Sequence, residues 1–235
     1  MQLKKQSGFT LVEIAIVLVI IGLLLGGILK GQELINSARV RNLADQNSGI
    51  QAAYYGFIDR YRQVPGDFKK ADAQTAIGQT ITLGGDGNGQ IDNTLTEAAA
   101  VWEQLSKANF IQGSYNPTAA PADEDTYRDV APVNAFNGAL TLTRNDDYTA
   151  DAAAPAATDR LNLHLGTNIP VNIARELDVK VDDSVPTAGI LRITTATAPW
   201  ATVHDADATC VDEGVDPDVY DIAKDAQSCG VVYLY

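Results

Sequence analysis

One segment of the sequence alternates oxygen-bearing side chains with glycines: Gly84-Gly85-Asp86-Gly87-Asn88-Gly89-Gln90-Ile91-Asp92. Such side chains on a glycine-rich turn can converge on Ca²⁺, which prefers carboxylate, amide and carbonyl oxygens. The segment is an incomplete EF-hand loop, because the first aspartate and the final bidentate glutamate of that loop are missing. Two interpretations stay open: a solvated turn, or weak, stabilising calcium binding through Asp86, Asn88 and Asp92.

The remaining chemistry-bearing side chains do not form a catalytic set. His164 and His204 are far apart in the sequence, and the cluster His204-Asp205-Ala206-Asp207 is typical of a surface loop. The sequence has no nucleophile elbow, phosphate-binding loop, HExxH zinc motif or Cys-x-x-Cys pair. We therefore predict a protein that is not an enzyme and requires no cofactor.

Charge is distributed unevenly along the 235 residues, whose formal net charge is −13. Residues 1–70 carry 9 basic and 5 acidic side chains, whereas residues 71–235 carry 8 basic and 25 acidic ones. A carboxylate-rich body repels phosphate, which argues against nucleic acid as a general partner. The overall composition, 20% charged and 46% hydrophobic, is that of a folded domain and excludes a disordered chain.

An apolar run over residues 9–29, FTLVEIAIVLVIIGLLLGGIL, contains a single charged residue, Glu13. Because a helix rises ~1.5 Å per residue and membrane hydrocarbon is ~30 Å thick, this run is long enough to span a membrane. Lys4 and Lys5 before it favour a cytoplasmic N-terminus, which places the chain after Lys30 outside. No signal-peptidase site follows the run, so we expect it to be retained.

Glu13 needs an explanation, because a carboxylate inside hydrocarbon costs roughly 2.5–3.5 kcal/mol on insertion scales. A position at the membrane edge is one explanation. However, the surrounding residues Lys4-Lys5-Gln6-Ser7-Gly8-Phe9-Thr10-Leu11-Val12-Glu13 strongly resemble the leader and cleavage site of type IV pilins and type II secretion pseudopilins. The resemblance implies that a prepilin peptidase cuts between Gly8 and Phe9 and methylates the new Phe9 amine. It also implies that Glu13 pairs with that amine of a neighbouring subunit during assembly.

The same resemblance covers residues 4–65 and implies a location and partners. The precursor would be a single-pass protein of the bacterial inner membrane, and the assembled form an extracellular pilus filament. Its partners would be the peptidase, the inner-membrane assembly machinery and identical subunits in a helical homopolymer.

The sequence departs from many pilins around Lys30, where it lacks their helix-breaking proline. Gly22, Gly26 and Gly27 lie nearby instead. Each interior glycine costs ~1 kcal/mol of helix stability relative to alanine, so the helix could unwind there during assembly. Alternatively, these small residues allow close helix packing.

The elements that position these residues follow from hydrophobic periodicity. Beyond Lys30, apolar residues recur at three- and four-residue steps and predict an amphipathic continuation of the helix: Leu43, Ile50, Tyr54, Phe57, Ile58 and Tyr61. Val64-Pro65-Gly66 should end a helix that runs from about 9 to 62. The predicted organisation is a leader (1–8), a transmembrane and filament-core segment (9–30), an amphipathic half (31–64) and a globular head (65–235).

The head is predicted to be α+β, with the long helix packed on an antiparallel sheet. A helix over 94–108 has a candidate capping box, Thr94 and Glu97, and should turn Val101, Trp102 and Leu105 inward. The pattern also predicts a short helix over 168–179. Strand patterns recur at 139–143, 161–165, 189–194 and 231–235, and surface loops are expected at 117–125 and 149–158.

Cys210 and Cys229 are the only cysteines, and both lie in the part of the chain expected outside the membrane. A bond between them would close a loop of about 20 residues and stabilise the fold by ~3 kcal/mol in the loop-entropy treatment. We predict a disulfide formed in an oxidising, periplasm-like compartment. A C-terminal cysteine pair also resembles the head of pilins.

These features predict a structural subunit of a type IV pilus, whose helices bundle in an extracellular filament serving adhesion, motility or DNA uptake. The nearest alternative is a minor pilin or type II secretion pseudopilin in a short rod or tip, favoured by a head larger than that expected of a compact major subunit. An alternative of another class is a monomeric, membrane-anchored, calcium-dependent adhesin or binding domain.

Overall fold

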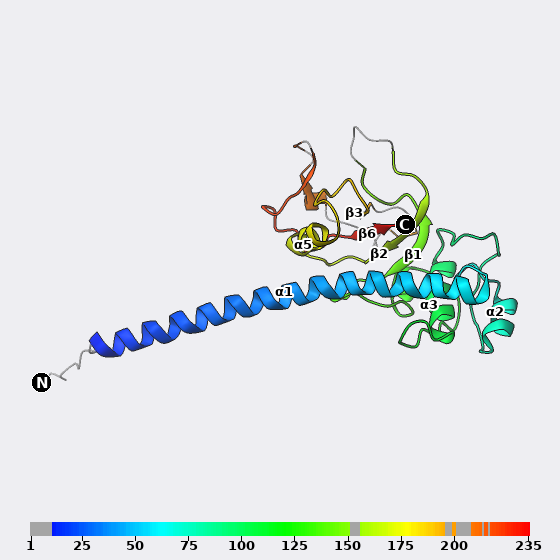
Figure 1. Ribbon diagram of the computed structural model, residues 1–235, viewed down its shortest axis with the longest axis horizontal. Coiled ribbons are helices and arrows are strands. Elements are labelled where there is room, and N and C mark those ends of the chain that lie inside the picture. Colours follow the sequence, from blue (N-terminus) through cyan, green and yellow to red (C-terminus); the bar gives the residue numbers. More distant parts are fainter. Residues whose placement is uncertain (1–10, 151–155, 196–198, 201–207, 213, 216) are drawn as a thin grey trace, which may run out of the picture. The chain divides into compact units, whose positions relative to one another are not determined.

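The computed structural model of the protein describes residues 11–150, 156–195, 199–200, 208–212, 214–215 and 217–235 (Figure 1). The chain divides into two compact units, residues 1–39 and 40–235. Helix α1, Leu11–Tyr61, begins in the first unit and ends in the second. All other helices and strands belong to the second unit.

The described part of the first unit is helical and has no buried residue. The most apolar 18-residue window of α1 has a mean hydropathy of 2.8, and its large side chains are exposed, from Leu11 at 92% to Leu29 at 66%. A helix that is apolar on all sides suits a membrane or a bundle of like helices. By length and composition it is a candidate transmembrane helix, which agrees with the prediction from sequence.

Over the described residues α1 agrees with the predicted helix from about 9 to 62, and it runs without a break across Gly22, Gly26 and Gly27. It ends at Tyr61 because Arg62 takes a left-handed conformation, with φ of 55°. Pro65 and Gly66 then carry the chain away, and Gly66 has a φ of 93°. A Cβ at Gly66 would lie 2.5 Å from a methyl carbon of Val101, so this close approach also requires glycine.

The second half of α1 supplies one wall of the head core. Its fully or nearly fully buried side chains recur at helical spacing: Val40, Leu43, Ile50, Ala53 and Phe57. Tyr54, Ile58 and Tyr61 are half-buried beside them. The predicted apolar stripe is therefore confirmed, and it extends to Val40.

Four strands form an antiparallel sheet in the order β1-β2-β6-β3, which confirms the α+β class. They are β1 (Thr141–Asn145), β2 (Arg160–His164), β3 (Leu191–Ile193) and β6 (Val231–Leu234). One buried row crosses all four strands: Leu142, Leu163, Tyr233 and Leu191. The first strand begins two residues later than predicted, because Ala139 pairs with Val133 in an isolated bridge.

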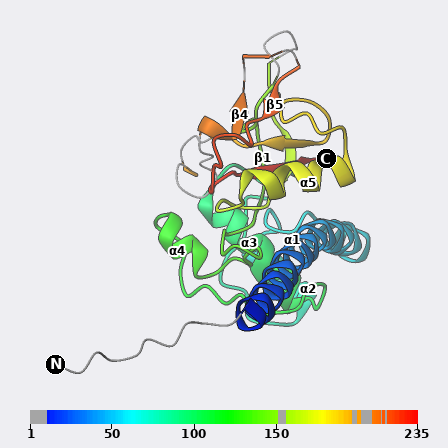
Figure 2. The same ribbon diagram turned by 90° about the vertical axis from the view of Figure 1, so that its left-hand side faces the viewer.

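Helices α3 (Leu95–Lys107) and α5 (Val171–Val181) confirm the two predicted short helices. As expected, Val101, Trp102 and Leu105 are fully buried. The hydrophobic pattern did not predict α2 (Lys70–Ile77), α4 (Glu124–Arg128), the 3-10 turn η1 (Ala208–Cys210), or the strand pair β4 (Val211–Asp212) and β5 (Val219–Tyr220). In Figure 2 the β4–β5 pair lies near the top of the head, above α5, and α3 and α4 lie below α5.

The segment 117–125, predicted as loop, instead leads into α4. Asp123 caps this helix: its side chain accepts a 2.9 Å hydrogen bond from the N–H of Thr126. The helix has only 5 residues, too few for hydrophobic periodicity to reveal it. Of the other predicted loop, 149–158, residues 151–155 lie outside the described part of the chain.

Candidate functional site

The N-terminal part of the candidate site lies on and before the first turn of α1. Gly8 and Phe9, the predicted cleavage and methylation positions, lie outside the described residues. Glu13 is in the first helical turn and is exposed, between Val12 at 67% and Ile14 at 49% exposure. The structure thus places a carboxylate among exposed apolar side chains at the start of an apolar helix.

The glycine-rich segment 84–92 is organised by a carboxylate from outside it. Asp67 is buried, and its two oxygens accept three backbone hydrogen bonds, from Gly87 at 2.6 Å, Asn88 at 3.1 Å and Gly89 at 2.8 Å. Successive backbone N–H groups in a turn form an anion-binding concavity. Asp67 therefore occupies this concavity as an internal anion and holds the turn in place.

Polar side chains of α3 hold the segment that leads from Asp67 to the turn. Glu103 is buried and accepts backbone hydrogen bonds from Thr82 at 2.7 Å and Leu83 at 2.8 Å. Gln104, also buried, accepts a 2.9 Å hydrogen bond from the N–H of Gly66. Because α3 binds both ends of the segment 66–83, it brings Asp67 and the glycine-rich turn together.

Glu97 is a further carboxylate at this turn. Its backbone N–H donates to the Thr94 hydroxyl at 3.3 Å, so Thr94 caps α3 as predicted. The reciprocal half of the predicted capping box is wrong, because the Glu97 carboxylate accepts the N–H of Asp92 at 2.7 Å instead. Burial raises the pKa of Glu97 to about 7, and the neighbouring carboxylates of Asp92, Asp67 and Asp86 add to this effect, against the opposing hydrogen bond from Asp92.

The residues predicted to bind calcium are arranged differently from the expected ligand set. Asn88 donates its side-chain amide to Asp92 at 3.1 Å and accepts the N–H of Gln90 at 2.8 Å. The carboxylates that converge are Asp86, Asp67 and Glu97, whose oxygens lie within 4.8 Å of one another. Asp67 and Glu97 were missed because they contribute from outside the segment 84–92. Calcium binding stays a prediction.

A second acidic group tightens the turn after α5. Asp178 is fully buried and accepts hydrogen bonds from the Tyr220 hydroxyl at 2.8 Å and the Ser184 N–H at 3.2 Å. Burial raises its pKa to about 6 despite these two hydrogen bonds. Asp182 accepts the backbone N–H of Leu191 at 3.1 Å. These carboxylates connect α5 to β3 and β5, and their hydrogen bonds give them a structural role.

The predicted disulfide between Cys210 and Cys229 is confirmed, with a Cα–Cα distance of 5.9 Å. Both cysteines are fully buried. The disulfide links Cys229, in the segment before β6, to Cys210, the last residue of the 3-10 turn before β4. The N–H of Cys229 also donates a hydrogen bond to the carbonyl of Ile169 at 2.8 Å. The disulfide therefore anchors the β4–β5 pair to the segment before β6, one of the two inner strands of the sheet.

Residues 3–29 match the family described as the prokaryotic N-terminal methylation motif. The chain carries the N-terminal signature of type IV pilins and pseudopilins. No curated protein and no solved structure matches it. The match ends within α1, before the head begins. Together with the apolar helix, the motif fits a pilin-like precursor that is anchored in the inner membrane and processed by a prepilin peptidase.

Of the two histidines, His164 lies in the described part of the chain. His164 is fully buried on β2, with its Nε2 atom 3.3 Å from the side-chain oxygen of Asn145. Burial lowers the pKa of His164 to about 3, so the ring is neutral at physiological pH. The cluster His204-Asp205-Ala206-Asp207 lies outside the described residues.

Proposed function

We propose that the protein is a structural subunit of a type IV pilus that polymerises through its N-terminal helix after its leader is removed. In this proposal residues 1–8 are the leader, 9–30 the membrane and filament-core segment, 31–64 the amphipathic half of the helix, and 65–235 the head. The role is assembly, with no catalysis and no required cofactor. Adhesion, motility and DNA uptake are alternative uses of the same filament.

One observation carries the proposal: the apolar part of α1, residues 11–29 with Glu13 as its single acid, continues without a break into the helical residues that pack in the head core. In the membrane, lipid covers the apolar side chains of such a helix. Outside the membrane, only other apolar helices can cover them, and identical copies supply these. Glu13 would then meet the methylated amine of Phe9 on a neighbouring subunit, because a carboxylate in an apolar bundle requires a cation.

The mass of the mature N-terminus tests the proposal. A chain that begins with methylated Phe9, recovered in sheared surface fibres, supports it. A chain that retains Met1 and the two leader lysines would reject it and favour a monomeric anchored binding domain. Replacing Gly8 by a bulky residue should leave the precursor uncleaved, since the peptidase must fit the backbone at this position.

A minor pilin or pseudopilin is the second candidate, and the size of the head favours it. Beyond the four-stranded sheet the head carries α4 and the β4–β5 pair, whereas its C-terminal disulfide favours a pilin. Abundance separates the two candidates. A major pilin should dominate the mass spectrum of sheared fibres, whereas a minor pilin or pseudopilin should be a trace component or stay in the periplasm.

A further inference from the structure

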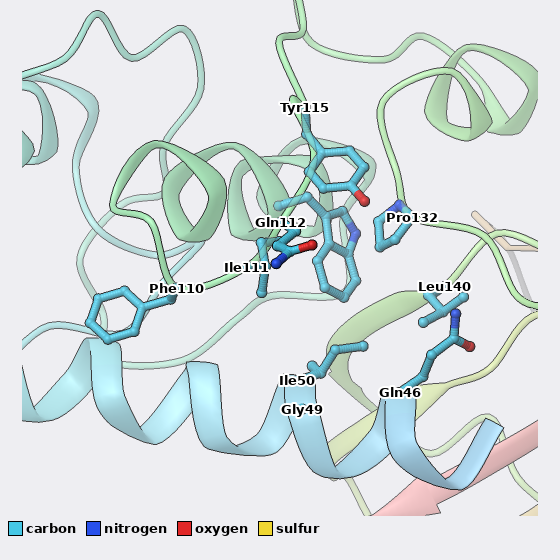
Figure 3. A pocket seen from close by; sticks show the side chains of 10 residues that line it. Gln46, Gly49, Ile50, Phe110, Ile111, Gln112, Tyr115, Pro132 and Leu140 are labelled. Carbon is cyan, nitrogen blue, oxygen red and sulfur yellow. The ribbon is translucent and has the colours of Figure 1, made fainter. Parts of the chain in front are cut away.

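A pocket of about 290 Å³ opens on the head beside the second half of α1 (Figure 3). Ile50 and Gln46 rise from the helix, Tyr115 lies across from them, and Phe110 lies beside the helix. Trp102, which is fully buried, also lines the pocket. Its volume is at the lower end of the range for small-molecule sites, ~300–1,000 Å³. The size suits one or two apolar side chains of a protein partner.

Gly49 lies on the helix at the edge of this pocket and has no explanation within its own chain. It is exposed, and a Cβ built on it would meet no atom within 4 Å. A glycine in a helix interior costs ~1 kcal/mol relative to alanine. Gly56 on the same helix offers a contrast, because its Cβ would lie 2.9 Å from a ring carbon of Phe110. Packing within the chain requires the glycine at position 56 and does not require the one at 49.

A glycine on a helix surface lets a second helix approach its backbone closely. The pocket beside Gly49 would then receive side chains from that helix. The second helix must supply apolar side chains that are exposed in their own chain and that follow the apolar run over residues 9–29. Leu34 and Ile35 of α1 meet this description, with 62% and 55% exposure, and both follow Lys30.

We propose that this pocket receives Leu34 and Ile35 from α1 of a second copy of the chain. The inference rests on the proposed polymerisation and specifies one contact within it. Because all copies enter the membrane in the same direction, the two helices are parallel. Aligning Ile35 with Gly49 displaces the copies along the helix axis by about 21 Å, at 1.5 Å per residue.

The first test fills the pocket in the full chain, expressed with its assembly machinery. Gly49→Phe should lower the yield of sheared fibres by about tenfold or more, since overfilling a packed contact shifts its equilibrium by about that factor. Ser48→Phe is the matched control and should assemble normally. It adds the same ring to the neighbouring exposed residue, ~100° further around the helix and outside the pocket lining. Both variants should be cleaved and inserted like the wild type.

The second test does not depend on a bulky substitution. The two native cysteines form the disulfide, so introduced cysteines are the only free thiols. In fibres of the double variant Ile35→Cys/Gly49→Cys, oxidation should yield disulfide-linked multimers. The control Ile35→Cys/Ser48→Cys should stay mostly monomeric on the same gel. Equal multimer ladders in both variants, or none in either, would overturn the contact.

The two proposals fail in distinguishable ways. Wild-type chains that are processed but form no multimers would overturn the polymerisation, and this contact with it. Wild-type fibres together with normal Gly49→Phe fibres would overturn the contact alone.

Discussion

The carboxylate of Asp67 accepts a 2.6 Å hydrogen bond from the backbone N–H of Gly87, and further ones from Asn88 and Gly89. Asp67 follows the end of α1, whereas these donors lie 20 to 22 residues later in the glycine-rich turn. The turn that resembles a calcium loop is therefore ordered by a protein carboxylate.

Asp67→Asn should destabilise the chain by about 1.5–3 kcal/mol, because an amide cannot replace a buried carboxylate that accepts three N–H groups. Urea unfolding of the full chain in detergent micelles measures the change. Asp45→Asn, an exposed position on α1, should shift the free energy of unfolding by less than about 0.5 kcal/mol. Equal effects of the two substitutions would contradict the role assigned to Asp67.

Substituting alanine for two glycines of α1, Gly49 and Gly56, should change the stability of the chain in opposite directions. Gly56→Ala places a methyl group 2.9 Å from the Phe110 ring, and overpacking costs roughly 1–3 kcal/mol. Gly49→Ala meets no atom of its own chain and should stabilise the helix by about 1 kcal/mol. Thermal unfolding in micelles should separate the two variants, and a lower midpoint for Gly49→Ala would contradict the open space at that position.

His164 should make the head acid-sensitive. Burial lowers the pKa of His164 to about 3 in the folded chain, whereas the unfolded chain titrates near 6.5. Between these values the unfolded chain binds a proton that the folded chain does not, so the free energy of unfolding falls as pH falls from 6.5. The full loss is roughly 3–5 kcal/mol.

Glu97 and Asp178, whose pKa values are raised, act in the opposite direction. The measurement is therefore the difference between the wild type and His164→Gln in urea unfolding. As pH falls below 6.5, the free energy of unfolding of the wild type should fall relative to that of His164→Gln. A pH-independent difference would show that His164 does not cause the sensitivity.

The predicted binding of Ca²⁺ at the turn 84–92 can be tested by thermal unfolding. If Asp86 binds the ion together with Asp67 and Glu97, millimolar Ca²⁺ should raise the melting temperature of the full chain relative to chelator. The shift should be lost in Asp86→Asn and kept in Asp182→Asn, which lies in the other acidic group. An unchanged melting temperature in the wild type would favour the solvated-turn interpretation.

Glu13→Ala should separate processing from assembly. The variant chain should be cleaved and retained in the membrane, because removing a charge makes the apolar helix easier to insert. Fibre yield should fall strongly, since in the proposed assembly the Phe9 amine of the next subunit would lose its partner. Glu13→Asp is the matched control that keeps the charge and should restore part of the yield. Normal fibres from Glu13→Ala would reject the pairing.

Features that depend on local patterns could be predicted from the order of amino acids. Apolar residues at a period of 3.6 predicted α1, α3 and α5, and short β-branched and apolar runs predicted the four strands of the sheet. The only two cysteines, both in the part of the chain expected outside the membrane, predicted the bond between Cys210 and Cys229. The motif around Glu13 consists of consecutive residues, so the order of amino acids is enough to recognise it.

Contacts between residues far apart in the chain could not be predicted in this way and became visible in the folded protein. Helix α2 has 8 residues with Ala73 alone buried, so it offered no apolar stripe to recognise. The strand order β1-β2-β6-β3, the approach of Asp67 to the turn and the pocket beside Gly49 all join segments far apart in the sequence. Such contacts are selected by packing and by hydrogen bonding of buried groups, neither of which leaves a periodic signal in the chain.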